Sequence, residues 1–272
     1  MRVKTPVGEL FVDDVGQGPP VVLWHSFLHH GGMWRGVVDA LRTRHRLINV
    51  DAPGHGRSAK VDRPLTMDDC ASALAAVYEA CGIERAHFAG LSWGGMVGMT
   101  LALRASRLLG SMVLLDTSCR REPLKNRLEY TLLGAIFRKV GPLPPLIRRV
   151  APLFFAPATL RNDPALVEEW QQYVVRLDGE SVWHTLQCIV DRPDVQQPLT
   201  HVRVPTLVVV GAEDRAQPPS ESRTIAAAIP GARLVTIDGA GHLSALERPL
   251  QVAAHLASFF GEHPLPIARA TT

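Results

Sequence analysis

The sequence alternates between short apolar runs and segments of helical periodicity, and this alternation restricts the folds that the chain can adopt. The apolar runs are predicted strands, at residues 21–25, 46–50, 86–90, 111–116, 205–211 and 232–238. The helical segments between them lie near residues 33–42, 67–81, 93–104, 219–228 and 249–260. Short strands that are apolar throughout are typical of a parallel sheet with both faces covered. We therefore expect an α/β fold with a mostly parallel central sheet flanked by helices.

A block of different character interrupts this alternation. After Asp116, residues 122–199 have the pattern of helices separated by prolines, and strands resume only beyond the block. We expect a core of residues 1–121 and 200–272, with 122–199 inserted as a helical cap at one edge of the fold. Most of the large apolar side chains of the block should pack on the core or on one another: Leu128, Leu132, Leu133, Ile136, Phe137, Leu153, Phe154, Phe155 and Trp183.

Composition and charge exclude several classes of protein. The net charge is only +3, and no block of Lys and Arg indicates a nucleic-acid surface. The start of the chain lacks the apolar core of a signal peptide, and no apolar run is long enough to span a membrane. We expect a cytoplasmic protein that binds neither nucleic acid nor membrane. The sequence leaves a homo-oligomeric state open.

The cysteines agree with a reducing compartment. Cys70 and Cys81 fall on one predicted helix, about 16 Å apart at ~1.5 Å per residue, which is too far for a disulfide. Cys119 and Cys188 are isolated in the sequence, and no C-x-x-C pair indicates a redox or zinc site. We expect four inert thiols, no metal site and no cofactor.

Ser92 is the first candidate for chemistry. It stands between Gly90 and Gly94 in "GLSWGG", where a predicted strand meets the helix at 93–104. A serine before a helix is commonly a cap. A sharp strand-to-helix turn, however, would expose a nucleophilic serine, and glycines two residues away on either side relieve its crowding. The helix N-terminus would also favour an oxyanion beside the serine.

A serine nucleophile needs a base, and His242 is the candidate. It follows the predicted buried strand at 232–238, and Gly239 and Gly241 leave room for its loop. The later histidines at 184, 201, 255 and 263 lie in the helical block, before a strand, in the last helix or in the tail. A capping or surface role is the alternative for His242.

A third residue must orient the imidazole and stabilise its cation. Asp214 follows the strand at 205–211, so it should reach the same sheet edge as His242. Glu213 is adjacent and should point elsewhere. Asp116, at the end of the strand at 111–116, is the competing acid. We expect Asp214 to be the acid, and the resulting order Ser, Asp, His is the one that this architecture favours.

An oxyanion formed at Ser92 needs two hydrogen-bond donors. We expect the backbone N–H groups of Trp93 and Phe27, the latter in the loop after the strand at 21–25. Removing one such donor costs roughly 3–4 kcal/mol of transition-state stabilisation. The neighbouring His25 and His29 are expected to structure the loop, as is His30.

With these residues assigned, the chain resembles the α/β-hydrolases over nearly its whole length. The shared motifs are "HSF", "DAPGHGRS", "GLSWGG", "GAEDRAQPP" and "DGAGHLSALERP". The resemblance implies a triad of Ser92, Asp214 and His242 beneath a helical cap. In "DAPGHGRS" it implies a tight turn near the pocket, which gives Asp51 and His55 a structural role.

Within that family the sequence is most similar to the 3-oxoadipate enol-lactonases, on "GLSWGGMVGM", "ALRTRHRLINVDAPGHGRS" and "IVDRPDVQQPLTHVRVPTLVVVGAEDRAQPP". His25-Ser26 resembles the enol-lactonase version of the oxyanion loop. Trp93 replaces the smaller apolar residue that the resemblance implies, so its ring is expected to narrow the pocket. Arg148 and Arg192 of the cap are candidates for a substrate carboxylate, with a solvated role as the alternative.

The expected function is hydrolysis of a small-molecule carboxylic ester or lactone through an acyl-enzyme. Three alternatives remain open: a hydrolase of carbon–carbon bonds in β-diketones or dienoic acids, a cofactor-free perhydrolase, and a slow ligand-sensing receptor. A cation at the far end of the cavity under the cap would favour an acidic lactone, and an apolar cavity would favour a neutral ester.

Overall fold

An eight-stranded sheet forms the centre of the computed structural model, which describes residues 1–265. The strands are β1 (Arg2–Thr5), β2 (Gly8–Val15), β3 (Pro20–Trp24), β4 (Arg46–Val50), β5 (Ala86–Leu91), β6 (Leu109–Leu115), β7 (Thr206–Gly211) and β8 (Arg233–Ile237). Their order is β1-β2-β4-β3-β5-β6-β7-β8. β2 runs antiparallel to both of its neighbours, and the other adjacent pairs are parallel. The predicted α/β fold with a mostly parallel sheet is therefore confirmed.

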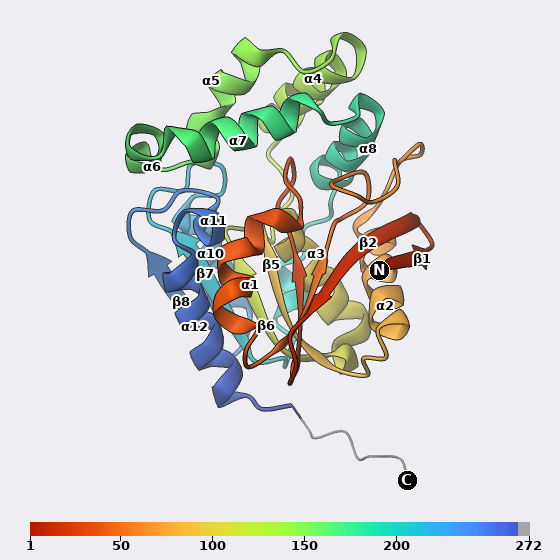
Figure 1. Ribbon diagram of the computed structural model, residues 1–272, viewed down its shortest axis with the longest axis vertical. Coiled ribbons are helices and arrows are strands. Elements are labelled where there is room, and N and C mark those ends of the chain that lie inside the picture. Colours follow the sequence, from red (N-terminus) through yellow and green to blue (C-terminus); the bar gives the residue numbers. More distant parts are fainter. Residues whose placement is uncertain (266–272) are drawn as a thin grey trace.

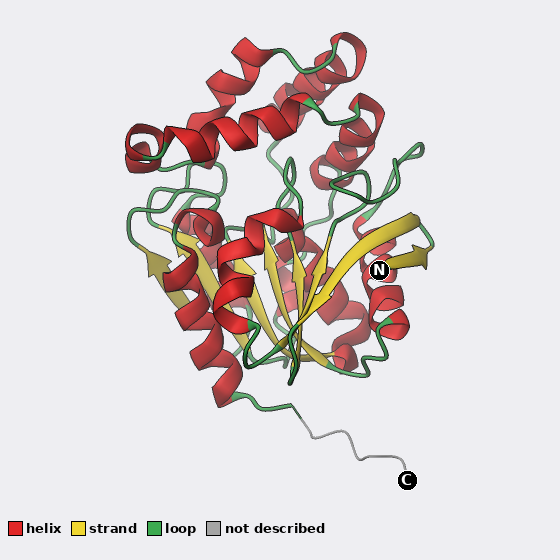
Figure 2. Cartoon of the chain, viewed as in Figure 1, coloured by secondary structure: helices red, strands yellow, loops and turns green. Residues whose placement is uncertain are grey.

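The core helices cover both faces of the sheet, as Figures 1 and 2 show. They are α1 (Arg35–Leu41), α2 (Met67–Ala80), α3 (Trp93–Ala105), α10 (Pro219–Ala228), α11 (Ser244–Glu247) and α12 (Pro249–Glu262), with short 3₁₀ helices η1 (Gly31–Trp34) and η2 (Ser106–Leu108). Thr66 followed three residues later by Asp69 predicts a capping box at the start of α2, and the structure confirms it. The Thr66 hydroxyl accepts from the backbone N–H of Asp69, whose carboxylate accepts from the N–H of Thr66.

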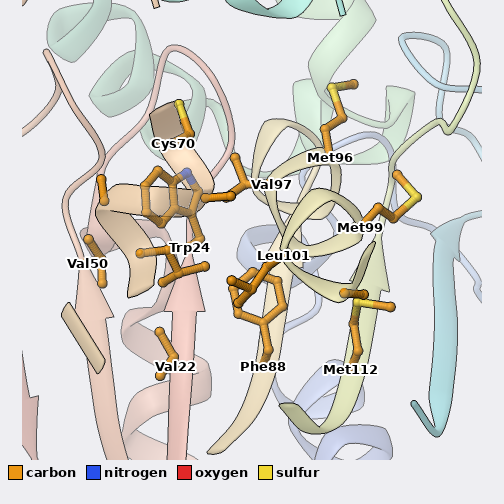
Figure 3. Close-up of a cluster of buried hydrophobic side chains, with 14 of the residues drawn as sticks. Val22, Trp24, Val50, Cys70, Phe88, Met96, Val97, Met99, Leu101 and Met112 are labelled. Carbon is orange, nitrogen blue, oxygen red and sulfur yellow. The ribbon is translucent and has the colours of Figure 1, made fainter. Parts of the chain in front are cut away.

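Alternation along the strands divides the core into two clusters. Val22 and Trp24 of β3 face α2 and α3, in the cluster drawn in Figure 3. Val21 and Leu23 of the same strand point to the opposite face, where they join residues of α1 and α12. Apolar side chains on both faces explain why the strands are uniformly apolar in sequence. This two-sided core fixes the carboxyl ends of the strands in place.

The chain between β6 and β7 is helical. It contains α4 (Leu124–Val140), α5 (Pro144–Phe154), α6 (Pro157–Asn162), α7 (Pro164–Val175), α8 (Gly179–Val190) and α9 (Gln196–Leu199). Figure 1 shows α4 to α8 above the ends of the central strands. Proline stands in the first turn of α5, α6 and α7, where the missing N–H has no intrahelical partner to lose. The division into a core of 1–121 and 200–272 and a cap of 122–199 stays a prediction, and residues 266–272 lie outside the described part.

Several apolar side chains of this helical block are exposed, whereas the sequence predicted that most of them would be buried. Leu128 and Leu132 of α4 are 66% and 63% exposed, and Leu153 of α5 is 41% exposed. Phe155, in contrast, is fully buried with Trp170 in the same cluster as α1 and α12. The difference arises because α4 packs chiefly on α8, which leaves the side of α4 that carries Leu128 and Leu132 uncovered. No helix in that range is long and apolar enough to cross a bilayer.

The strand before His242 is not the buried strand that the sequence predicted. In β8, Arg233, Leu234 and Thr236 are exposed, and only Ile237 is fully enclosed. The cause is its position, because β8 is the last strand in the sheet and pairs only with β7.

All four cysteines are buried and free. Although no other cysteine lies near Cys188 in the sequence, its side chain contacts Cys70 of α2 in the core. This contact and burial raise the pKa of the Cys70 thiol well above its usual value. No cluster of three His, Cys, Asp or Glu side chains in residues 1–265 has the arrangement of a metal site.

Candidate active site

Ser92 occupies a strained turn between β5 and α3. Its backbone lies at φ 55° and ψ −110°, in a region that residues with a Cβ rarely adopt. The turn brings main-chain segments so close together that side chains are excluded. A Cβ on Gly90 would lie 2.3 Å from the carbonyl oxygen of Gly94, and one on Gly94 would lie 2.3 Å from that of Trp24. The two glycines therefore permit the turn, as the sequence predicted.

Three side chains that are distant in the sequence form a hydrogen-bonded chain at the carboxyl edge of the sheet. The Oγ of Ser92 lies 2.9 Å from Nε2 of His242. Nδ1 of His242 lies 2.9 Å from Oδ2 of Asp214, which follows β7. Oδ1 of Asp214 accepts from the backbone N–H groups of Ala216 and Gln217, each at 2.9 Å. The aspartate is thus fixed by its own turn.

The surroundings of His242 favour its cation. Burial is the largest influence on the pKa of His242 and lowers it, but the charges of Asp214, Asp116 and Glu247 raise it above the ordinary value overall. Asp214 also contributes through its hydrogen bond. An imidazole in this setting can take a proton from the Ser92 hydroxyl and hold it beside a carboxylate.

Asp116, the competing acid, lies nearby with different partners. Its Oδ1 accepts from the N–H of Gly211, and its Oδ2 accepts from the hydroxyl of Ser244. Burial and the charge of Asp214 raise the pKa of Asp116 well above its usual value. Through these hydrogen bonds, Asp116 connects the loops that carry Asp214 and His242. Glu213, the neighbour of Asp214 in the chain, is exposed.

Two backbone donors, one in the loop after β3 and one next to Ser92 in the chain, are unused. Within residues 1–265, neither the N–H of Phe27 nor that of Trp93 has a hydrogen-bond acceptor. Trp93 opens α3, whose N-terminal N–H groups carry partial positive charge. These are the two donors that the sequence predicted for an oxyanion.

The ring of Trp93 lies in the core. It is fully buried, packs edge-on against Trp24 at 6.0 Å between ring centroids, and lies 5.4 Å from the ring of His55. The ring packs within the hydrophobic cluster that also contains Trp24. The expectation that this ring narrows the pocket therefore finds no support in its packing.

The histidines near the site hold loops together. Nε2 of His25 accepts from the N–H of Ala52, and its Nδ1 donates to the carbonyl of Ser26. Nδ1 of His55 similarly donates to the carbonyl of Pro53. Asp51 accepts from the N–H groups of Gly31 and Arg57. These contacts match the structural roles expected for the two loops.

The two cap arginines differ in their surroundings. Arg192 is only 4% exposed, and its guanidinium donates to Glu122 at 3.1 Å and to the carbonyl of Ile189. Its charge is therefore balanced within the protein. Arg148 is exposed on α5, as the solvated alternative predicted.

Three residues connect the helical block to the site through contacts that the sequence did not predict. Phe154 places its ring 5.5 Å from that of His242, edge to face. The Tyr173 hydroxyl donates to the carbonyl of His29 and accepts from the N–H of Gly56. Glu247 is a buried carboxylate beside the His242 loop. No periodicity distinguishes them, although a glutamate directly after the apolar residues Ala245 and Leu246 is a weak signal.

Comparison with known proteins places this geometry in context. Residues 21–255 match the sequence model of the alpha/beta hydrolase family. A relative from Azorhizobium caulinodans, provisionally named as the carbamate hydrolase RutD, is 30% identical, with 93% of this chain and 96% of the relative covered. A solved esterase from Thermogutta terrifontis superimposes with a TM-score of 0.92 at 28% identity, covering 97% of this chain and 99% of that one. An enol-lactonase from Burkholderia xenovorans gives 0.89 at 26% identity, covering 96% and 100%.

Proposed function

The chain belongs to the alpha/beta hydrolase family, and we propose that it is a serine hydrolase that cleaves a carboxylic ester or lactone. The observation that carries this proposal is the continuous hydrogen-bonded chain from Ser92 through His242 to Asp214. The strained backbone of Ser92 supports a nucleophile, because a capping serine requires no left-handed φ. The likeness to an esterase and an enol-lactonase supports the same class of substrate.

In the proposed acylation step, Oγ of Ser92 attacks the carbonyl carbon while Nε2 of His242 takes the hydroxyl proton. The negative charge that develops on the carbonyl oxygen is stabilised by the N–H groups of Phe27 and Trp93. Asp214 holds the imidazole by its Nδ1–H and stabilises the cation. As the tetrahedral intermediate collapses, His242 returns the proton to the leaving alkoxide, which stays tethered if the substrate is a lactone.

In the proposed deacylation step, water attacks the acyl-enzyme. His242 takes a proton from this water and later returns it to Oγ of Ser92, which releases the carboxylic acid. The same oxyanion donors act in both half-reactions, because the carbonyl oxygen occupies the same place in each. No step requires a metal or an organic cofactor.

Variants of the triad test the roles of its members. Ser92→Ala should abolish turnover of short p-nitrophenyl esters while the circular dichroism spectrum stays unchanged. Asp214→Asn should lower turnover on the order of 10⁴-fold, because it removes the acceptor that fixes the imidazole tautomer. Asp116→Asn is the matched control, and its turnover should fall far less, since Nδ1 of His242 hydrogen-bonds to Asp214 and not to Asp116. Equal losses in the two aspartate variants would reassign the acid.

A substrate panel tests the proposed class. Rates with an aryl ester, a lactone and a carbamate should be compared at equal concentration, using Ser92→Ala as the blank. Faster turnover of the ester or the lactone is expected. The likeness to a protein named as a carbamate hydrolase supports the carbamate as the second candidate, and a preference for it would overturn the first.

A further inference from the structure

Glu247 is a buried carboxylate without an ion-pair partner in residues 1–265. It ends α11, is 7% exposed, and makes no salt bridge there. Its Oε1 accepts from the N–H of Gly241 at 2.8 Å. Its Oε2 accepts from the N–H of Ala156 at 2.9 Å and from the hydroxyl of Thr159 at 2.5 Å. Burying an unpaired charge is costly unless hydrogen bonds replace its hydration, and here three do so.

The partners of Glu247 come from two different parts of the chain. Gly241 immediately precedes His242, whereas Ala156 and Thr159 belong to the segment between α5 and α6 and to α6 itself. One carboxylate therefore joins the loop of the proposed base to the helical block above it. A hydrophobic side chain of similar size could fill the space but could not accept any of the three hydrogen bonds.

Two further contacts hold the same pair of segments together. The N–H of Leu243 donates to the carbonyl of Phe154 at 3.2 Å. At Gly241 the segments approach so closely that a Cβ would lie 2.6 Å from the backbone nitrogen of Ala156. The His242 loop is thus in direct main-chain contact with residues 154–156, and Phe154 also packs on the imidazole.

We propose that Glu247 is a positioning residue that fixes the His242 loop against residues 154–159 and adds a negative charge beside the imidazole. The inference rests on the proposed role of His242 as the base. Glu247 influences His242 through its hydrogen bond to Gly241 and through the field of its charge. It does not touch a reacting atom. The charged groups that influence His242 are Asp214, Asp116 and Glu247. Burial raises the pKa of Glu247 above its usual value, while its three hydrogen bonds and the charge of Arg248 act to lower it.

A purely structural role predicts a different result from a positioning role. If Glu247 only joins two segments, its removal should lower the stability and leave the imidazole unchanged in the folded fraction. If it positions and polarises the base, its removal should lower the pKa of His242 and slow the reaction of Ser92 in fully folded protein. The second result requires a readout at the imidazole itself.

The test compares Glu247→Gln with Glu221→Gln. Glu221 is a matched control, since it also accepts from a hydroxyl and from a second donor near the sheet edge, but its partners are Ser118 and Arg120. The first readout is the titration of His242 by NMR in histidine-labelled protein. The second is the rate at which a fluorophosphonate labels Ser92, where an O–P bond forms, a P–F bond breaks and His242 accepts the serine proton.

In Glu247→Gln we expect the His242 titration to move to lower pH and labelling at pH 8 to slow at least tenfold. Glu221→Gln should change neither beyond twofold. If Glu247→Gln does not fold, Thr159→Val takes its place as the test. This variant keeps the charge of Glu247 and removes one of its three hydrogen bonds. It should slow labelling of Ser92 and shift the titration of His242 less than Glu247→Gln would. An unchanged titration and labelling rate in folded Glu247→Gln would overturn the inference. Absence of labelling in the wild type would instead refute the proposed function, while the titration would still decide about Glu247.

Discussion

The two aspartates near the imidazole carry the same functional group but have different surroundings. Asp214 accepts from His242 and from its own turn, so its charge faces the base. Asp116 accepts from Gly211 and Ser244, and its neutral form is favoured by burial and by the neighbouring aspartate. At the scale of single residues, the role of each aspartate is therefore decided by its hydrogen-bond partners and not by the kind of amino acid.

The raised pKa of His242 leads to a prediction about pH. The base must be neutral to accept the serine proton, so a raised pKa requires a higher pH for activity. We therefore expect kcat/KM for a p-nitrophenyl ester to rise with pH along an acidic limb centred above 6.5, the usual value for histidine. A pH–rate profile from pH 5 to 9 measures this. A limb centred below pH 6 would contradict the prediction.

At the scale of elements, backbone strain is concentrated where strands end at the site. In residues 1–265, the non-glycine residues with positive φ are Leu28, Ser92 and Asp116. They lie just after β3, β5 and β6, three adjacent strands of the sheet. Each such residue costs on the order of 1–3 kcal/mol, and the two-sided core stabilises these turns. Strain at this edge thus accompanies the placement of the proposed nucleophile and oxyanion donors.

A glycine substitution tests how closely the turn at Ser92 is packed. In Gly94→Ala the new Cβ would meet the carbonyl of Trp24 at 2.3 Å, so we expect the midpoint of urea unfolding to fall markedly and esterase activity to be lost. Gly261→Ala in α12 is the control, because its Cβ would meet nothing within 4 Å. That variant should gain up to about 1 kcal/mol, since alanine favours helix over glycine. Equal stability of the two variants would show that the backbone around Gly94 is not packed as closely as the structure indicates.

At the scale of the whole molecule, buried neutral histidines limit stability in acid. Burial lowers the pKa of His29 to about 3 and that of His55 and His87 to about 4. In the unfolded chain the same groups take up a proton near pH 6.5. The unfolded state therefore binds more protons below pH 6.5, and stability is lost as the pH falls from there toward 4. At 1.36 kcal/mol per pKa unit, the fully buried His55 alone costs about 3 kcal/mol at pH 4.

Removing one of these histidines should reduce the sensitivity to acid. His87 of β5 stacks on Phe260 of α12, and His87→Gln should reduce the loss of unfolding free energy between pH 7.5 and pH 5. Urea unfolding at the two pH values measures the loss. His201→Gln, at an exposed position, should leave it unchanged. The prediction fails if His87→Gln loses as much stability in acid as the wild type.

Local signals predicted much of this protein. The uniformly apolar strands require a sheet covered on both faces, and Thr66 with Asp69 specifies the start of α2. The sequence could not reveal that β8 is an edge strand or that Leu128 and Leu132 are exposed, because burial depends on neighbours from distant parts of the chain. The partners of Glu247 were hidden for the same reason, since Thr159 lies 88 residues away.

By itself, the sequence determined the elements and the turn at Ser92, because hydrophobic periodicity and glycine placement act over a few residues. Only the tertiary structure decided which acid faces the imidazole. Asp116 and Asp214 both follow strands that end at the same edge, and their sequence contexts are alike in this respect. The distinction arises from a hydrogen bond between residues 28 positions apart. A hydrogen bond of this kind forms only after the strands are aligned, so it cannot be predicted from local sequence patterns.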